Sequence, residues 1–304
     1  MTDQRYPFFS VIVPTYNRPA QLLACLESLK RLEYPREDFE VIVVDDGSQT
    51  PLQEKVALFR TQLNITLITQ EHSGPAMARN RGTTKAKGPF LAFTDDDCTP
   101  APDWLRTLGA RFDRTPDRMI GGQTFNIVSD NFYSEVSYLL VEYLYSYYNA
   151  DSKRARFFTS NNFALPADHF HTINGFNPCF PRAAGEDREF CERWLGHGYR
   201  MTYAPEVQVY HRHALTFSTF CRQHFNYGRG AFHFHKIRTR DPSGSFRTEP
   251  LSFYSNMLNY PFSSKRNRFA FLFSALLFVT QMANASGFLW EWMKQKRKRF
   301  GQPG

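Results

Sequence analysis

Residues 8–18 read FFSVIVPTYNR, an apolar and partly β-branched run that gives way to a polar segment. A short apolar run bounded in this way is typical of a strand buried inside a sheet. The pattern returns within the first hundred residues, with segments of helical apolar spacing in between. The further strands are predicted at 39–44, 64–69 and 89–94, and the helices at 19–31, 52–63 and 75–86. This alternation predicts an α/β fold with a mainly parallel sheet covered by helices on both faces.

The composition is that of a folded chain with room for one large core. The 304 residues are 42% hydrophobic and 22% charged, which lies outside the range of disordered sequences. The formal net charge of +8 suits a phosphorylated ligand, an anionic lipid surface or a nucleic acid. Charge alone does not choose among these three classes of partner.

Cysteine use and the N-terminus both indicate a reducing, cytoplasmic setting. The five cysteines are scattered and include no CxxC pair, which argues against a disulfide framework and against a thiolate zinc site. Residues 1–10 contain no apolar segment of the signal-peptide type. Secretion is therefore not expected.

Acidic residues follow two of the predicted strands. Asp45 and Asp46 come after the second strand, and Asp95, Asp96 and Asp97 follow the fourth. Ligands of such sheets bind beyond the carboxyl ends of the strands, so these carboxylates are expected to face one crevice. Their mutual repulsion raises pKa values unless a cation neutralises them, and oxygen ligands favour Mg²⁺ or Mn²⁺. Asp-rich turns that only end strands and cap helices are the alternative.

Two common nucleotide-binding signatures are missing from the sequence. No GxGxxG follows the first strand, and no GxxxxGK[ST] occurs anywhere. Oxidoreduction with a dinucleotide and P-loop hydrolysis of a nucleoside triphosphate are therefore disfavoured.

Short motifs occur in a fixed order along residues 9–235. They lie at 11–18, 41–48, 74–82, 93–97, 160–162, 175–177, 185–187 and 207–213. In this order they resemble the motifs of the inverting family-2 glycosyltransferases, which have a Rossmann-like sheet of the GT-A type. The resemblance implies a hexosyltransferase-type enzyme that moves a sugar from a nucleotide-diphospho-sugar to an acceptor hydroxyl.

The resemblance also implies where the donor binds. Thr15, Tyr16 and Asp46 would hold the nucleoside base. Asp45 would lie close by, and Arg79 would lie near the diphosphate. The complete predicted donor site comprises Pro14, Thr15, Tyr16, Asn17, Arg18, Asp45, Asp46, Arg79, Asp95, Asp96, Asn161 and Asn162.

A metal site is implied by the acidic triplet, which matches the DxD motif of the family. Asp95 and Asp97 would be its outer carboxylates, for the ribose and for Mn²⁺ or Mg²⁺, although Asp96 could replace either. In many relatives a histidine at the position of His211 completes the metal ligands through a neutral imidazole nitrogen. His213 lies two residues on and could substitute for it.

The predicted general base is Asp187 in the pair Glu186-Asp187. An inverting transfer needs a base near the acceptor hydroxyl, and residues 188–194 are typical of a helix that begins at this pair. A capping role for Asp187 or Glu186 at the helix start is the alternative. Asn161 and Asn162 are predicted to bind hydroxyls of the donor sugar, with turn formation as their competing role.

One departure from the family separates this chain from the processive polysaccharide synthases. Those enzymes have a QxxRW motif, whereas residues 223–227 read QHFNY. The several membrane spans of those synthases are also missing. Transfer of a single sugar is therefore expected.

The C-terminal region reads as a helical extension, residues 236–304, after a GT-A domain of residues 1–235 with a nucleotide-binding half (1–100) and a catalytic half (101–235). Residues 269–290 contain no charged side chain, and basic residues flank them on both sides. A helix lying on an anionic membrane through 265–299 and a buried helix of a soluble protein are equally good interpretations. A single span is disfavoured by cations on both sides.

Three other functions remain as alternatives. A nucleotidyltransferase of sugar phosphates would show a Gly-rich basic loop after the first strand, and a non-catalytic binding module would have lost the DxD motif or the base. A nucleic-acid binder would show a recognised motif. The preferred hypothesis is synthesis of a surface glycan or glycolipid from a UDP-, GDP- or dTDP-sugar onto a glycan or lipid-linked acceptor. No nucleic acid is involved, and the location is the cytoplasm or the inner face of the plasma membrane.

Overall fold

The computed structural model describes residues 6–128, 130–180, 184–239, 248–263 and 267–300. The chain forms two compact units. The sheet unit comprises Met1–Ile127, Tyr148–Pro181 and Asp187–Arg212. The helical unit comprises Val128–Tyr147, Arg182–Glu186 and His213–Gly304.

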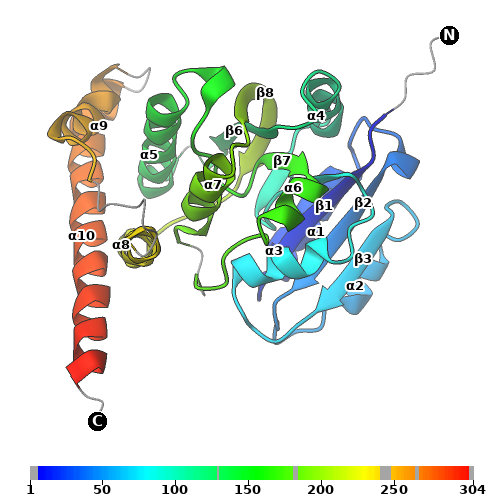
Figure 1. Ribbon diagram of the computed structural model, residues 1–304, viewed down its shortest axis with the longest axis horizontal. Coiled ribbons are helices and arrows are strands. Elements are labelled where there is room, and N and C mark those ends of the chain that lie inside the picture. Colours follow the sequence, from blue (N-terminus) through cyan, green and yellow to red (C-terminus); the bar gives the residue numbers. More distant parts are fainter. Residues whose placement is uncertain (1–5, 129, 181–183, 240–247, 264–266, 301–304) are drawn as a thin grey trace. The chain divides into compact units, whose positions relative to one another are not determined.

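The sheet unit is built on one mixed sheet with the strand order β3-β2-β1-β4-β7-β6-β8-β5 (Figure 1). The first four strands of this order are mutually parallel; β7 and β5 run antiparallel to their neighbours, and β6 and β8 pair in parallel. The predicted mixed, mainly parallel sheet is thus confirmed. The strands are β1 (Phe9–Thr15), β2 (Phe39–Asp45), β3 (Ile65–Thr69), β4 (Phe90–Phe93), β5 (Cys98–Pro100), β6 (Met119–Asn126), β7 (Phe163–Pro166) and β8 (Met201–His211).

Helices cover both faces of this sheet because its inner strands are buried on both sides. Val11 and Val13 of β1 share a core with the apolar side of the first helix, whereas Ile12 points to the other face. There Gly82 allows close approach, since a Cβ on it would lie 2.7 Å from Ile12 Cγ2. The helices are α1 (Pro19–Leu29), α2 (Gln53–Ala57), α3 (Pro75–Thr83), α4 (Trp104–Phe112), α6 (Ala167–Thr172) and α7 (Glu186–Gly196), with 3-10 turns η1 (Arg36–Asp38) and η2 (Ser152–Arg154).

One predicted helix is shorter than expected. The spacing at 52–63 predicted a continuous helix, but α2 ends at Ala57 and turns follow, with Phe59 N donating to Val56 O. Phe59 and Leu63 are nevertheless buried, so their four-residue spacing reflects two contacts with the core and not one regular helix.

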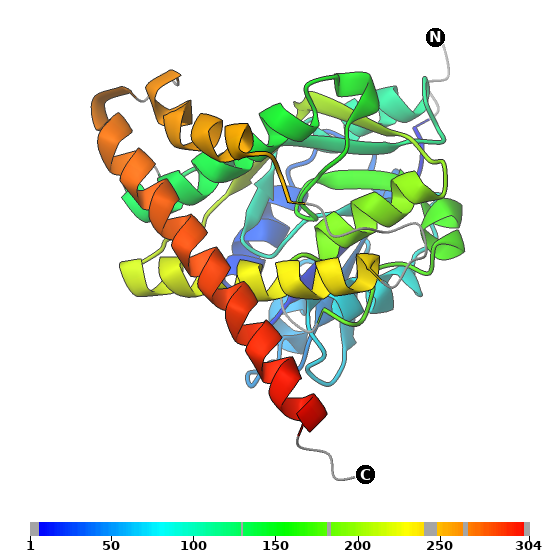
Figure 2. The same cartoon turned by 60° about the vertical axis from the view of Figure 1, so that its left-hand side comes forward.

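The helical unit contains α5 (Phe132–Tyr148), α8 (Phe217–Arg238), α9 (Leu251–Ser263), η3 (Asn267–Phe269) and α10 (Ala270–Phe300). Figure 2 shows these helices. Their inward side chains form a core of their own. In the part of the chain that the structure describes, one helix, α10, is long and apolar enough to cross a membrane, on length and composition alone.

The domain limits expected from the sequence stay predictions. The proposed boundary at residue 235 falls inside α8, and α5 belongs to the helical unit although it precedes much of the sheet unit in the chain. Long-range packing, which local patterns do not report, brings α5 to α8 and α10. Of the basic residues expected to flank α10, Lys265 and Arg266 lie outside the described residues.

Candidate active site

The acidic triplet lies in the turn between β4 and β5, at the carboxyl end of the parallel strands. Ile12 of β1 pairs with Phe93 of β4, so Thr15 and Asp96, each three residues further on, reach the same level. Thr15 Oγ1 donates to Asp96 Oδ2 at 2.7 Å. Burial, reinforced by the neighbouring Asp97 carboxylate, raises the pKa of Asp96 to about 6.

Two arginines from different elements pair with the triplet. Arg18, at the N-cap of α1, contacts Asp97 Oδ2 at 2.9 Å and Asp96 Oδ1 at 3.3 Å. Arg79 of α3 is buried and donates to Asp95 Oδ1 at 2.7 Å. The sequence predicted that a bound cation would neutralise the carboxylates. It did not reveal that Arg18 and Arg79 already neutralise part of their charge.

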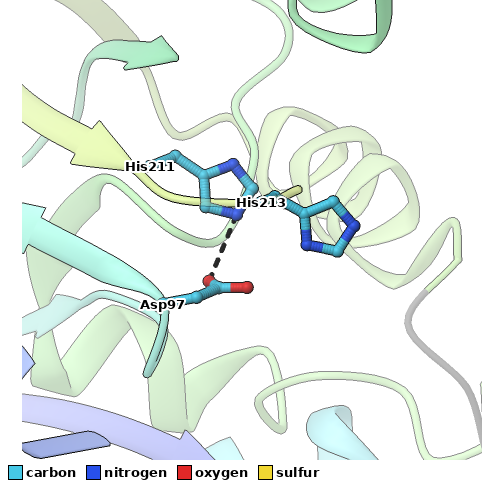
Figure 3. Close-up of side chains that lie close together, drawn as sticks. All are labelled: Asp97, His211 and His213. Carbon is cyan, nitrogen blue, oxygen red and sulfur yellow. Dashed lines mark ion pairs between the residues drawn. The ribbon is translucent and has the colours of Figure 1, made fainter. Parts of the chain in front are cut away.

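His211 meets the triplet through the pairing of β5 with β8. Cys98, next to Asp97, lies opposite His211 in this antiparallel pair, and His211 Nε2 is 3.2 Å from Asp97 Oδ1 (Figure 3). Burial by itself would lower the pKa of His211, but the carboxylate of Asp97 outweighs it and raises that pKa. At this separation of 3.2 Å the Asp97 carboxylate and the His211 imidazole are close enough to ligate one metal ion. His213 belongs to the helical unit, where its Nε2 lies 3.0 Å from Gln223 Oε1.

The carboxylates after β2 organise the neighbouring loops. Asp46 accepts hydrogen bonds from Gln70 Nε2, Ser73 N and Gly74 N at 2.7–2.9 Å. Asp45 accepts from the backbone N–H of residue 48. Residue 74 is a glycine with φ 90°, a backbone conformation that favours glycine. Asp46 thereby fixes the loop after β3 beside the end of β1.

A flat aromatic surface results from this loop arrangement. Tyr16 and His72 stack with ring centroids 4.0 Å apart, and His72 Nδ1 lies 2.9 Å from Asp46 Oδ2. Asn17 joins the two adjacent loops, since its side chain accepts from Gln49 N and its backbone N–H donates to Ser48 Oγ. His72 was not among the predicted site residues, and its position just after the third strand was the available signal.

Asp187 lies in the first turn of α7 in the sheet unit. Its Oδ1 accepts from Arg188 N at 2.9 Å. Burial raises the pKa of Asp187, and the positive charge of Arg79 is the largest opposing influence. Glu186, in the helical unit, is buried and accepts from Ala184 N at 2.7 Å. Both carboxylates accept backbone N–H groups at a helix start, so capping and base roles are geometrically compatible for Asp187.

The two predicted asparagine ligands differ in their surroundings. Asn162 is buried; its Oδ1 accepts from Trp104 Nε1, and its Nδ2 donates to the carbonyls of Gln123 and Val207. Because Asn162 is fully buried and both hydrogens of its Nδ2 are already donated, its contacts favour a structural role. Asn161 is partly exposed, and its Oδ1 accepts from Thr159 Oγ1 at 2.8 Å.

Residues 10–177 match the sequence family described as glycosyl transferase family 2, a span of more than half of the chain. The chain belongs to glycosyl transferase family 2. Residues 143–215 of this family-2 chain also match the family described as the N-terminal domain of galactosyltransferase.

Characterised relatives of the family-2 chain carry transferase names. It is 31% identical to glycosyltransferase AglE of Haloferax volcanii over 236 residues, 74% of this chain and 73% of the relative. It is also 31% identical to validoxylamine A glucosyltransferase of Streptomyces hygroscopicus subsp. jinggangensis over 228 residues, 66% of this chain and 54% of that protein. The chain thus spans about half the length of this second relative.

Among solved structures, the family-2 chain is similar to the mannosyltransferase PcManGT from Pyrobaculum calidifontis in complex with GDP-Man and Mn²⁺. The TM-score is 0.60 at 21% identity, over 92% of this chain and 76% of that chain. At this identity the likeness concerns the fold. Together with the mixed sheet, it confirms the predicted GT-A architecture.

Proposed function

We propose that this family-2 glycosyltransferase transfers a single sugar, with inversion, from a nucleotide-diphospho-sugar to an acceptor hydroxyl in a reaction that needs a divalent cation. The observation that carries the proposal is the convergence at one sheet edge of Asp95–Asp97, Arg18, Arg79 and His211. Closely spaced carboxylates beside arginines suit a ligand that is a phosphate group bound together with a cation.

The donor base is assigned to the surface formed by Tyr16 and His72. The Tyr16 ring is 40% exposed, so it can stack a flat heterocycle, and stacking on an aromatic side chain tolerates any base. Pro14 and Thr15 end β1 beside it, and Asp45 and Asp46 fix the loops on the other side. This surface does not distinguish UDP, GDP and dTDP by itself.

The residues of the metal site fit Mn²⁺ or Mg²⁺. Carboxylate oxygens and one imidazole nitrogen are a donor set that Mn²⁺ accepts, and Asp97 and His211 already lie 3.2 Å apart at their nearest atoms. Asp95, the third predicted ligand, is 30% exposed at its side chain although it contacts Arg79. When bound, such a cation offsets the negative charge that grows on a departing diphosphate.

Arg18 and Arg79 are assigned to the diphosphate. The Arg18 side chain is 44% exposed and can exchange a carboxylate partner for a phosphate oxygen with little change in burial. Arg79 is fixed by Asp95, and its charge also acts on Asp187. Because Arg79 would act on both the leaving diphosphate and the general base Asp187, donor binding would be coupled to the protonation of Asp187.

Asp187 is assigned as the base that takes the proton of the acceptor hydroxyl. Burial raises its pKa, which brings a carboxylate closer to the range in which it removes a proton efficiently near neutral pH. The positive charge of Arg79 opposes this rise. The Asp187 carboxylate would therefore accept the proton at one of its oxygens as the new glycosidic bond forms.

The biological setting that we propose is synthesis of a surface glycan or glycolipid at the cytoplasmic side of the plasma membrane. The absence of the QxxRW motif at 223–227 supports transfer of one sugar per acceptor. The relatives carry transferase names for different products, so the acceptor is left open between a glycan and a lipid-linked sugar.

The test is a thermal-shift series with UDP, GDP and dTDP, each with and without Mn²⁺. We expect one nucleotide to raise the Tm, with a further rise in Mn²⁺ that Asp97→Ala removes. Asp117→Ala, which alters an exposed carboxylate between α4 and β6, is the matched control and should keep the Mn²⁺-dependent rise. The proposal fails if no nucleotide raises the Tm, or if Asp97→Ala responds to Mn²⁺ like the unaltered chain.

A further inference from the structure

One side of α10 is apolar and exposed along nearly its whole described length. Phe271, Phe278, Met282, Leu289 and Met293 are between 45% and 84% exposed. They follow one another at spacings of seven and four residues, which places them on one face of a helix with about 3.6 residues per turn. We call these five residues the outer stripe.

The opposite side of α10 is packed inside the helical unit. Leu277, Thr280 and Glu291 are buried there. The backbones of α8 and α10 meet closely, because a Cβ added to Gly228 would lie 1.8 Å from Asn284 O, and one added to Gly287 would lie 1.9 Å from Phe225 O. Figure 2 shows α10 crossing α8. The helix therefore has a fixed inner face, and the outer stripe points away from it.

A partly buried ion pair and a nearby histidine tie the inner face to α8. Glu291 Oε2 lies 2.9 Å from Arg229 Nε, and Glu291 Oε1 lies 3.5 Å from His233 Nε2. Insertion of α10 across a bilayer would separate Glu291 from Arg229 or bring α8 and its charges into the hydrocarbon. Either change is costly, since a charge that loses its partner in an apolar medium is strongly destabilised.

Side chains that are typical of the membrane interface lie at both ends of the outer stripe. Arg268 lies over the ring of Phe269 at its N-terminal end, and Lys296 Nζ lies 3.9 Å from the ring centroid of Trp292 at its C-terminal end. Lys294 and Arg297 are also exposed at the C-terminal end. Tryptophan beside lysine and arginine is favoured at the level of lipid headgroups, where the ring is partly buried and the cation meets phosphate.

We infer that the outer stripe of α10 is a docking surface for an anionic lipid bilayer, with the helix lying in the plane of the membrane and not across it. In this orientation the apolar side chains of the stripe enter the acyl region of one leaflet, and the neighbouring cations remain at the level of its phosphates. A spanning helix would use its apolar surface on all sides, whereas the inner face of α10 is already occupied by protein. The surface belongs to the helical unit and does not depend on the proposed sugar transfer.

The experiment is co-sedimentation of the full chain with vesicles of phosphatidylcholine alone and of phosphatidylcholine with phosphatidylglycerol, at low and high salt. We expect binding to the anionic vesicles and loss of that binding in high salt. The double variant Phe278→Ser/Leu289→Ser should bind at least about tenfold more weakly, because two exposed apolar side chains no longer leave water on docking. The triple variant Lys294→Gln/Lys296→Gln/Arg297→Gln should lose about fivefold per cation on anionic vesicles.

Matched controls separate docking from folding and from catalysis. Leu58→Ser removes an apolar side chain that is 72% exposed in the sheet unit, and it should bind vesicles like the unaltered chain. Nucleotide-dependent Tm shifts should be equal in all these chains. Equal binding to neutral and anionic vesicles, unchanged binding of Phe278→Ser/Leu289→Ser, or retention on membranes until detergent is added would each overturn the inference. A dimer in light scattering that Phe278→Ser/Leu289→Ser converts to a monomer would assign the stripe to a second copy instead.

Discussion

The sheet unit and the helical unit each contain a network of acidic and basic side chains, and the two networks differ in their balance of charge. In the helical unit, one carboxylate, Glu291, meets Arg229 in a buried pair between two helices. In the sheet unit, three consecutive carboxylates, Asp95–Asp97, meet two arginines, Arg18 and Arg79, at the end of a strand.

We infer from this difference that the Glu291 network stabilises the fold, whereas the triplet network can bind a ligand. Both networks contain buried carboxylates, but the partner of Glu291, Arg229, is only 18% exposed, so a partner change there would leave a largely buried charge uncompensated. In the triplet three acids face two arginines, and His211 adds a third positive charge only when it is protonated, so a further cation is favoured while His211 is neutral. Arg18 is 44% exposed, and water or a phosphate can replace its present partners.

The largest expected effect concerns Asp187, on which Arg79 of the triplet network acts. Asp187→Asn should slow sugar transfer by about 10³-fold, because the amide cannot accept the proton of the acceptor hydroxyl. Nucleotide affinity should change much less than the rate, since the proposed general base would contact the acceptor and would act on the nucleotide only through Arg79. Initial rates and nucleotide-dependent Tm shifts measure the two quantities. A variant with near-normal turnover would leave Asp187 as a helix cap.

The second-largest expected effect concerns the free energy of unfolding that each network contributes. Glu291→Ala should lower the free energy of unfolding by about 3 kcal/mol, since Arg229, whose side chain is only 18% exposed, would lose its carboxylate partner. Asp97→Asn should change it by less than about 1 kcal/mol, because one of several repelling charges is lost and Arg18 can turn to water. Urea unfolding followed by circular dichroism compares the two variants. Similar losses in both would show that the triplet is as structural as Glu291.

A pH dependence is expected from a neutral histidine in the helical unit. Burial lowers the pKa of His224 to about 4, and its Nε2 lies 3.2 Å from Ser137 Oγ. The folded state therefore holds His224 neutral, so the stability it contributes is present above pH 6.5 and is lost as the pH falls from there toward 4. At about 1.4 kcal/mol per pH unit this loss amounts to at most about 3 kcal/mol.

His224→Gln, which keeps a hydrogen-bonding group beside Ser137, is the variant that isolates this effect. The unfolding free energy of the unaltered chain should fall more steeply between pH 7 and 4.5 than that of the variant. Parallel curves for the two chains would assign the acid sensitivity to other groups.

The smallest expected effect concerns the aromatic surface formed by Tyr16 and His72. His72→Ala should weaken nucleotide binding by about fivefold, because Tyr16 would lose the ring that holds it in a stacked position. The control is His197→Ala, which alters an exposed histidine directly after α7 in the sequence. It should not change the affinity. Titration calorimetry measures both. An unchanged affinity in His72→Ala would remove His72 from the base site.

The order of elements and the grouping of acidic residues followed from the sequence. Apolar runs that end in polar motifs predicted β1, β2, β3 and β4, and the parallel ladder then brings Thr15 beside Asp96 by register alone. These features depend on local spacing, which a linear pattern reports directly. The family likewise follows from short motifs in a fixed order.

Contacts between distant segments were not predictable in the same way. Asn162 belongs to a family motif, yet its side chain is engaged by Trp104 and two carbonyls. Arg18 reads as part of a loop motif, and its pairing with Asp97 depends on where α1 begins relative to β4. A polar side chain has several possible partners, and the one it meets is set by packing of elements far apart in the chain.

The sequence by itself determined that the chain has a GT-A sheet with carboxylates at the ends of its strands, because strand periodicity and motif order are local properties. Only the tertiary structure decided which side of α10 is covered. The helix is apolar around most of its circumference, so its sequence fits a buried, a spanning and an interfacial helix equally. The glycine contacts and the Glu291 pair fix one side against α8 and leave the other side to meet water or lipid.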